Sequence, residues 1–142
     1  MKYRKQAQCI YYTRYHLVFV TKYRRKALSE GMGVYCVGIL RRICQNYPDL
    51  KLFEAKCDQD HIHFLISIPP KWSVSRAVNI LKSNTARATR RKFPFLNQLY
   101  DRHIGFWSDG YFVTTAGADE QQIKRYIQLQ GEEDSGQAEL EI

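Results

Sequence analysis

The sequence has no run of the ~18 to 20 uninterrupted apolar residues that a membrane-spanning helix needs. The N-terminal segment MKYRKQAQC also lacks the apolar core of a signal peptide. The four cysteines lie far apart with no C-x-x-C pair, which argues against a zinc knuckle and gives no reason to expect disulfides. A chain of 142 residues is the usual size of one domain. We therefore expect one cytoplasmic domain with reduced cysteines.

Acidic residues are scarce through most of the chain. Five of the fourteen follow Gly131, where there is no Lys or Arg, so residues 1–130 carry nine acidic against 22 basic side chains, a net charge of +13. The usual partner that offsets such a field is a polyanion, which favours nucleic acid over an ordinary basic surface. We expect residues 1–130 to form the single domain. Residues 131–142 make an acidic tail with little to bury, a composition typical of disorder.

Hydrophobic patterns predict strands and helices along the whole domain. Strand composition or alternation occurs in four segments: 9–22, 50–57, 61–68 and 111–115. Apolar spacing predicts helices over 34–46, from a Ser73 cap to before Pro94, and from an Asp119 cap through about Leu129, closed by Gly131. The order β-α-β-β-α-β plus one helix predicts an α+β, ferredoxin-like (RRM-like) fold, an antiparallel sheet with helices on one face.

His61 and His63 flank a single residue on a predicted strand. Side chains alternate along a strand, so both imidazoles point to one face, while Ile62, Phe64 and Ile66 point to the other. Two neutral histidines on one face can bind a divalent ion. Taken alone, this short spacing is more often an ordinary pair of exposed histidines, but the apolar residues are confined to the opposite face.

The last predicted helix carries a second pair of interest. Tyr126 and Gln130 are four residues apart and share a helix face beside Ile123 and Ile127. A tyrosine hydroxyl can attack phosphorus when a metal neutralises the phosphate, and a glutamine carbonyl is a hard oxygen ligand. With ten tyrosines in the chain, packing is the commoner role for any one of them.

Two histidines and one amide oxygen leave coordination positions open. Such a set suits Mg²⁺ or Mn²⁺ bound together with phosphate oxygens better than a closed structural zinc site. A two-histidine-motif phosphodiesterase would need a second H-x-T or H-x-H, and His16 and His103 supply neither. That class is excluded.

Four segments resemble, in order, the single-tyrosine transposases of the HUH superfamily, the transposase A family of small bacterial insertion sequences that move as single-stranded DNA. They are YHLVFVTKYRR at 15–25, DHIHFLISIPP at 60–70, WSDGYFVTTAG at 107–117 and YIQLQ at 126–130. The resemblance covers nearly all of residues 10–130. It has two departures, both outside the presumed metal site: the segment LKSNTARATRRKF at 81–93 is more basic than we expect, and Asp109 stands where we expect a basic residue.

The resemblance implies a bacterial or archaeal, metal-dependent enzyme that cuts and rejoins single-stranded DNA at hairpin-bearing ends. His61 and His63 would be metal ligands, Gln130 the third ligand, and Tyr126 the nucleophile that forms a 5′-phosphotyrosine link and releases a 3′-hydroxyl. The family also implies a homodimer with joined sheets, in which the tyrosine helix of one subunit completes the histidine site of the other. Basic residues are the expected DNA contacts, namely Lys22, Arg24, Arg25, Arg87, Arg90 and Arg91.

Other readings stay open at this point. Tyr23, Phe106 and Trp107 could stack on unpaired bases, although core packing is the commoner use of such aromatic residues. A domesticated relative could keep the chemistry and act on dispersed palindromic repeats. A non-catalytic RNA-binding domain of the same topology would present aromatic residues on its sheet, typically in a K/R-G-F/Y-G/A-F run, which is absent.

Overall fold

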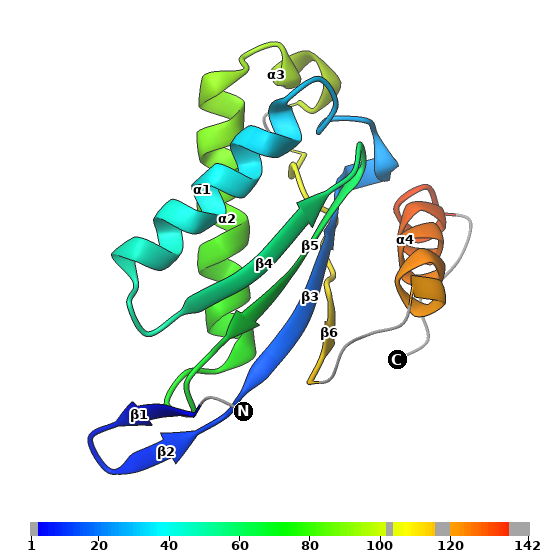
Figure 1. Ribbon diagram of the computed structural model, residues 1–142. Coiled ribbons are helices and arrows are strands. Elements are labelled where there is room, and N and C mark those ends of the chain that lie inside the picture. Colours follow the sequence, from blue (N-terminus) through cyan, green and yellow to red (C-terminus); the bar gives the residue numbers. More distant parts are fainter. Residues whose placement is uncertain (1–2, 102–103, 116–119, 137–142) are drawn as a thin grey trace.

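A four-stranded antiparallel sheet in the order β4-β5-β3-β6 forms the centre of the structure (Figure 1). The computed structural model describes residues 3–101, 104–115 and 120–136. The strands are β3 (Arg14–Val20), β4 (Lys51–Cys57), β5 (His61–Ser67) and β6 (Phe112–Thr114). Because β3 and β5 are central, the strands that carry YHLVFV and HIHFLIS lie side by side. The predicted ferredoxin-like arrangement is confirmed.

Two long helices cover one face of this sheet, as predicted. They are α1 (Met32–Asn46) and α2 (Val74–Lys92), followed by the short α3 (Leu96–Leu99). Their apolar sides pack on the inward side chains of β3 and β5, and the shared core includes Leu17, Phe19, Ile62, Phe64 and Ile66. The predicted Ser73 cap is confirmed, since the Ser73 hydroxyl accepts a hydrogen bond from the Arg76 amide at 3.1 Å.

The opposite face of the sheet is covered by α4 (Glu120–Asp134). Ile123 and Ile127 pack there against Val18 and Val20 of β3 and form a second, smaller apolar cluster. Helix α4 therefore occupies the sheet surface over β3, where an RNA-binding domain of this topology would present aromatic residues. Among the described residues, no helix is both long enough and apolar enough to span a membrane.

The predicted end of the last helix is wrong. The helix continues past Gly131 to Asp134, while its predicted cap, Asp119, lies outside the described residues. A Cβ at position 131 would lie 2.7 Å from Arg24 Cγ, so this glycine makes room for a neighbouring side chain and does not end the helix. The three residues that follow Gly131, Glu132 to Asp134, were assigned to the acidic tail but are helical.

The predicted strand over 9–22 is also wrong in its extent. It divides into β2 (Cys9–Tyr11) and β3, and β2 pairs with an unpredicted strand, β1 (Arg4–Gln6). The division occurs where the Thr13 hydroxyl donates to the carbonyl of Ile68 at 2.5 Å. After β3 the chain turns through η1 (Lys22–Arg24), in which Tyr23 and Arg24 have left-handed backbone angles.

Candidate active site

His61 and His63 lie on the α4 side of β5, as the alternation predicts. Their ring centroids are 5.9 Å apart, while Ile62 and Phe64 between and beyond them are buried in the main core. Cross-strand partners fix their position, because His63 pairs with Val18 and His61 pairs with Val20. The sheet therefore presents two imidazoles side by side.

Asp60 orients the first imidazole. Its Oδ1 lies 2.9 Å from His61 Nδ1, and its Oδ2 accepts a hydrogen bond from Arg24 Nε at 3.2 Å. The His61 hydrogen bond, reinforced by Arg24, lowers the pKa of Asp60 despite partial burial. A carboxylate on Nδ1 leaves Nε2 as the ligand nitrogen, a common arrangement around metal-binding histidines. This role of Asp60 was not predicted, although Asp60 directly precedes His61.

His16 is the corresponding neighbour of the second imidazole. Its Nε2 lies 3.3 Å from His63 Nδ1, and the two ring planes are parallel to within 1°. Burial lowers the pKa of both histidines, and the charges of His16, His61 and Lys56 lower that of His63 further. Both rings are therefore neutral near pH 7, which is the form that binds metals. From spacing alone, His16 showed only that it forms no second H-x-H or H-x-T motif.

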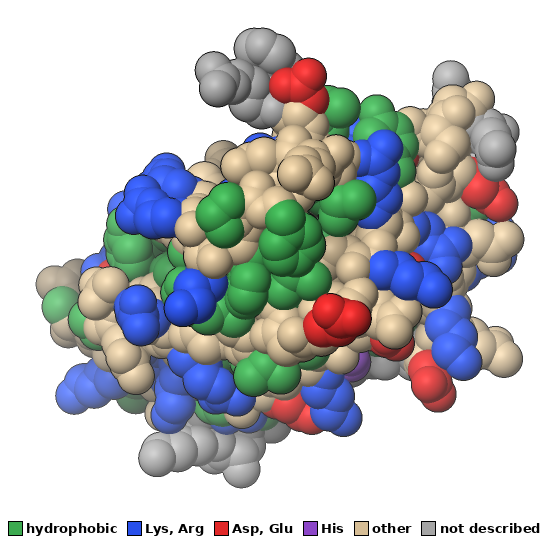
Figure 2. Space-filling view, turned by 90° about the horizontal axis from the view of Figure 1, so that it is seen from above, with side chains coloured by type: hydrophobic (Ala, Val, Ile, Leu, Met, Phe, Trp, Pro, Cys, Tyr) green, Lys and Arg blue, Asp and Glu red, His purple; other side chains and the backbone are tan. Residues whose placement is uncertain are grey.

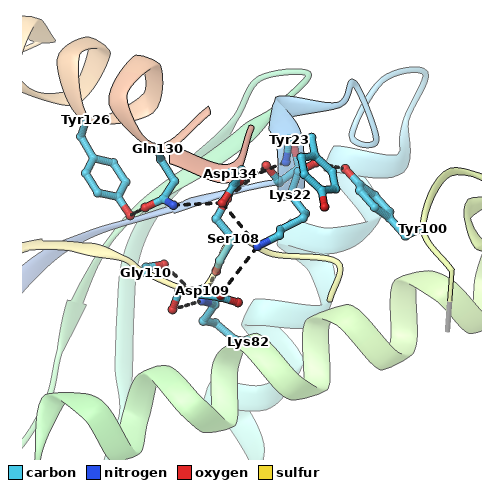
Figure 3. A network of polar contacts seen from close by, with 11 residues as sticks. Lys22, Tyr23, Lys82, Tyr100, Ser108, Asp109, Gly110, Tyr126, Gln130 and Asp134 are labelled. Atoms are coloured by element: carbon cyan, nitrogen blue, oxygen red, sulfur yellow. Dashed lines mark hydrogen bonds and ion pairs between the residues drawn. The ribbon is translucent and has the colours of Figure 1, made fainter. Parts of the chain in front are cut away.

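Tyr126 and Gln130 form a hydrogen-bonded pair on α4 (Figure 3). The Tyr126 hydroxyl donates to Gln130 Oε1 at 3.1 Å, and Gln130 Nε2 donates to Asp134 Oδ1 at 3.2 Å. The Tyr126 ring packs against Phe112 of β6, with centroids 5.6 Å apart. Burial, with the carboxylates of Asp134 and Glu133, raises the pKa of Tyr126, so the phenol keeps its proton at neutral pH.

Asp134 holds this end of α4 against the body of the protein. Besides Gln130, its carboxylate accepts hydrogen bonds from the Ser108 hydroxyl and from the Tyr23 amide at 3.0 Å, and it lies 3.4 Å from Lys22 Nζ. Burial works against the charge of Lys22, but Asp134 and Asp109 outweigh it and raise its pKa. Asp134 was predicted to belong to the tail, and no local pattern marks it.

The backbone of segment 108–110 lies next to the Tyr126 side chain. Lys82 Nζ donates to the carbonyls of Ser108 at 2.5 Å, Asp109 at 3.3 Å and Gly110 at 3.1 Å (Figure 3). A Cβ at Gly110 would lie 3.0 Å from Gln130 Oε1 and 3.4 Å from the Tyr126 hydroxyl oxygen. Glycine at this position therefore allows the Tyr126–Gln130 pair to lie directly on the backbone.

Within one chain, the predicted metal ligands and nucleophile fall into two separate groups. A cavity of 740 Å³ is lined by His61, Asp60 and one side of α4, including Gln128. A second cavity of 570 Å³ contains Tyr126 and Gln130 but neither histidine. Tyr126 lies over β6 and the histidines lie on β5, with β3 between them, which separates them by about 10 Å at ~4.8 Å per strand. Among the described residues, no three His, Cys, Asp or Glu side chains form a metal-binding group.

The six basic residues predicted to contact DNA differ in their surroundings. Arg24 is paired with Asp60, and Arg90 donates to the carbonyls of Tyr100, Asp101 and Ile104. Figure 2 shows Lys and Arg side chains distributed around the end of the molecule that is uppermost in Figure 1. The remaining four lie within ion pairs or ring contacts, as Lys22 and Arg25 do, or at the exposed surface, as Arg87 and Arg91 do.

The three aromatic residues proposed for base stacking also divide. Phe106 and Trp107 are 1% and 5% exposed and belong to the main core, so the commoner use of such residues, core packing, applies to both. Tyr23 is 37% exposed and lines the cavity that contains His61.

The sheet order, the paired histidines on β5 and the helix α4 are features expected of the transposase family that the sequence resembles. A family model described as IS200-like transposase matches residues 9–130, and this chain belongs to that family. The transposase of insertion sequence IS200 from Salmonella typhimurium is 39% identical over 129 residues, which are 91% of this chain and 84% of the relative. The ISDra2 transposase TnpA from Deinococcus radiodurans is 31% identical over 125 residues, 85% of this chain and 86% of the relative.

Two solved structures share the fold. A Deinococcus radiodurans R1 chain described as a transposase superposes with a TM-score of 0.79 at 28% identity, covering 96% of this chain and 99% of that one. A REP-associated tyrosine transposase bound to a REP hairpin gives a TM-score of 0.52 at 10% identity, covering 95% and 76%. The predicted family is confirmed.

Proposed function

We propose that this transposase cuts and rejoins single-stranded DNA through Tyr126. The phenol oxygen attacks the scissile phosphorus, the P–O3′ bond breaks, and the products are a 5′-phosphotyrosine link and a 3′-hydroxyl that takes up the phenol proton. A second 3′-hydroxyl reverses the step. The observation that carries the proposal is the Tyr126–Gln130 pair, whose hydroxyl and amide are held together over Gly110 at the edge of a cavity.

The residues present fit a divalent cation of the Mg²⁺ or Mn²⁺ type. His61 and His63 each have Nδ1 engaged by a neighbour, which leaves Nε2 for a ligand, and Gln130 supplies an amide oxygen. When bound by these three residues, the cation would neutralise charge on the phosphate. Asp60 and Asp134 orient two of the three donors, His61 and Gln130.

We infer that each site is shared between two subunits. Tyr126 and Gln130 face the β6 side of α4, away from the histidines of their own chain. The sheet ends in two edge strands, β4 and β6, through which a second copy could extend it. The histidines of one subunit and the tyrosine helix of its partner would then form one site, and the basic surface would bind the DNA strand.

A covalent-adduct assay tests the nucleophile. Wild-type protein incubated with Mg²⁺ and a labelled single strand bearing a hairpin should give an adduct that survives denaturation. Tyr126→Phe should reduce adduct formation by ~10³-fold or more while DNA binding persists. Tyr111→Phe is the matched control, because Tyr111 lines the same cavity and should leave the adduct intact. An adduct in Tyr126→Phe would show that another residue is the nucleophile.

A further inference from the structure

His16 and His63 make a hydrogen bond that runs in the plane of both rings. Their centroids are 5.6 Å apart and their planes are parallel, while the nitrogens are separated by 3.3 Å. The remaining 2.3 Å equals about two radii of a five-membered ring built from ~1.33 Å bonds. The two nitrogens therefore lie close to the line between the centroids, and each points at the other.

Such a contact needs one proton, and its position determines what His63 can do. If His63 Nδ1 carries the proton and donates to His16 Nε2, the lone pair of His63 lies on Nε2. If His16 Nε2 carries the proton, His63 accepts on Nδ1 and its own proton occupies Nε2. Only the first arrangement leaves a lone pair directed away from His16 and available to a metal.

The tautomer of His61 is already fixed, with the proton on Nδ1 and the lone pair on Nε2. The Asp60 carboxylate accepts from Arg24 Nε through one oxygen and lies 2.9 Å from His61 Nδ1 through the other, so His61 donates from Nδ1. For two histidines to bind one ion through equivalent nitrogens, His63 needs an acceptor on its own Nδ1. Register supplies one, because His16 precedes Val18, the cross-strand partner of His63, by two positions and so lies on the same face of β3.

We propose that His16 is a positioning residue that accepts a hydrogen bond from His63 Nδ1 and so reserves His63 Nε2 for the cation. This inference rests on the proposed metal role of His61 and His63. His16 contributes to His63 what Asp60 contributes to His61, except that its acceptor is neutral. It does not touch the reacting atoms itself.

The tautomer of His63 can be measured without metal or DNA. In long-range ¹H–¹⁵N spectra of the ¹⁵N-labelled full chain at pH 7.5 with chelator, His63 should be protonated on Nδ1. His16→Phe, which has no acceptor, should give a mixture of tautomers, and His16→Gln, whose amide oxygen can accept, should restore Nδ1 protonation. A wild-type His63 protonated on Nε2 overturns the proposal, and this measurement decides it even if His16→Phe fails to fold.

Metal affinity gives a second readout. His16→Phe should weaken Mn²⁺ binding 10- to 100-fold and His16→Gln by less than about threefold, with Asp60→Asn as a positive control for a lost orienting partner. Unchanged affinity in His16→Phe overturns the proposal. Failure of wild-type protein to bind Mn²⁺ contradicts the proposed metal site instead, and an adduct in Tyr126→Phe contradicts the proposed nucleophile; neither result alters the tautomer measurement.

Discussion

The burial and the hydrogen-bond partners of a single side chain determine its pKa in this protein. Tyr100 is an example outside the proposed chemistry: it is fully buried, and its hydroxyl donates to the carbonyl of Lys22 at 2.8 Å, which holds the turn that carries Lys22 and Arg24. Burial raises the pKa of Tyr100 to about 12, against the smaller opposing effects of Thr21 and Arg25. The folded protein therefore keeps this proton at a pH where the unfolded chain loses it.

Tyr100 should make the protein less stable in alkaline solution. Above pH 10 the unfolded chain releases the proton while the folded state retains it, so the free energy of unfolding falls as pH rises towards 12. Between pH 9 and 11 the loss from Tyr100 is about 1 kcal/mol. Urea unfolding at the two pH values should show a smaller decrease for Tyr100→Phe than for wild type. Equal decreases would mean that Tyr100 does not titrate as burial requires, while Tyr126, Cys36 and Cys44 add losses of the same sign to both proteins.

Among the elements, α4 depends most on contacts that are remote in sequence. Its buried apolar residues pack in one cluster with β3 and β6, and Asp134 fastens its C-terminal turn to Lys22, Tyr23 and Ser108. The Asp134 side chain is only 3% exposed, so its removal leaves several polar groups without a partner. The position of the proposed nucleophile thus depends on a residue two turns further along the same helix.

Asp134→Ala should loosen α4 without unfolding the sheet. We expect a loss of about 2–3 kcal/mol in the local stability of the helix, because a buried carboxylate with several partners is removed. Hydrogen exchange of the α4 amides should become faster while exchange in β3 and β5 stays unchanged. Glu133→Ala removes the same charge from an exposed neighbouring position and should have little effect. Similar exchange rates in the two variants would show that Asp134 is not an anchor.

Elements whose pattern is local were predictable, and those set by distant contacts were not. The β4–β5 hairpin and α2 follow from alternation, a short turn and the Ser73 cap, all of which lie within the segments themselves. The break at Thr13 and the continuation of α4 past Gly131 occur where the chain contacts Ile68 and Arg24, which are far away in sequence. For the same reason His61 and His63 could be found from their spacing in the sequence. The contact of His16 with His63 depends on strand register, and the contacts of Asp134 depend on the packing of α4, so neither could be found in this way.

For the whole molecule, the separation of the tyrosine from the histidines is the feature with the largest consequence. One chain contains both halves of the proposed site, but on opposite sides of α4. If the site is shared across a two-fold axis, two variants that are each inactive can complement one another. A site built within one chain would not allow this.

Co-expression of two inactive variants tests the shared site. Tyr126→Phe supplies intact histidines, and the double variant His61→Ala, His63→Ala supplies an intact tyrosine. Random pairing makes half of the dimers mixed, each with one complete site, so adduct formation should recover to about a quarter of the wild-type level. The covalent-adduct assay on the co-purified mixture measures this. No adduct, with the mixed dimer verified by differential tags, would contradict a site shared between subunits.

The contact between Gly131 of α4 and the Arg24 side chain matters for protein engineering. Exchange of a glycine inside a helix for alanine is a standard thermostabilising substitution, worth up to about 1 kcal/mol in helix propensity. In α4 the space beside Gly131 is occupied by the aliphatic part of Arg24, whose guanidinium reaches Asp60 and through it His61. The methyl group of an alanine would displace that arginine, so a more heat-resistant helix would be obtained at the expense of a misaligned imidazole across the cavity that α4 lines.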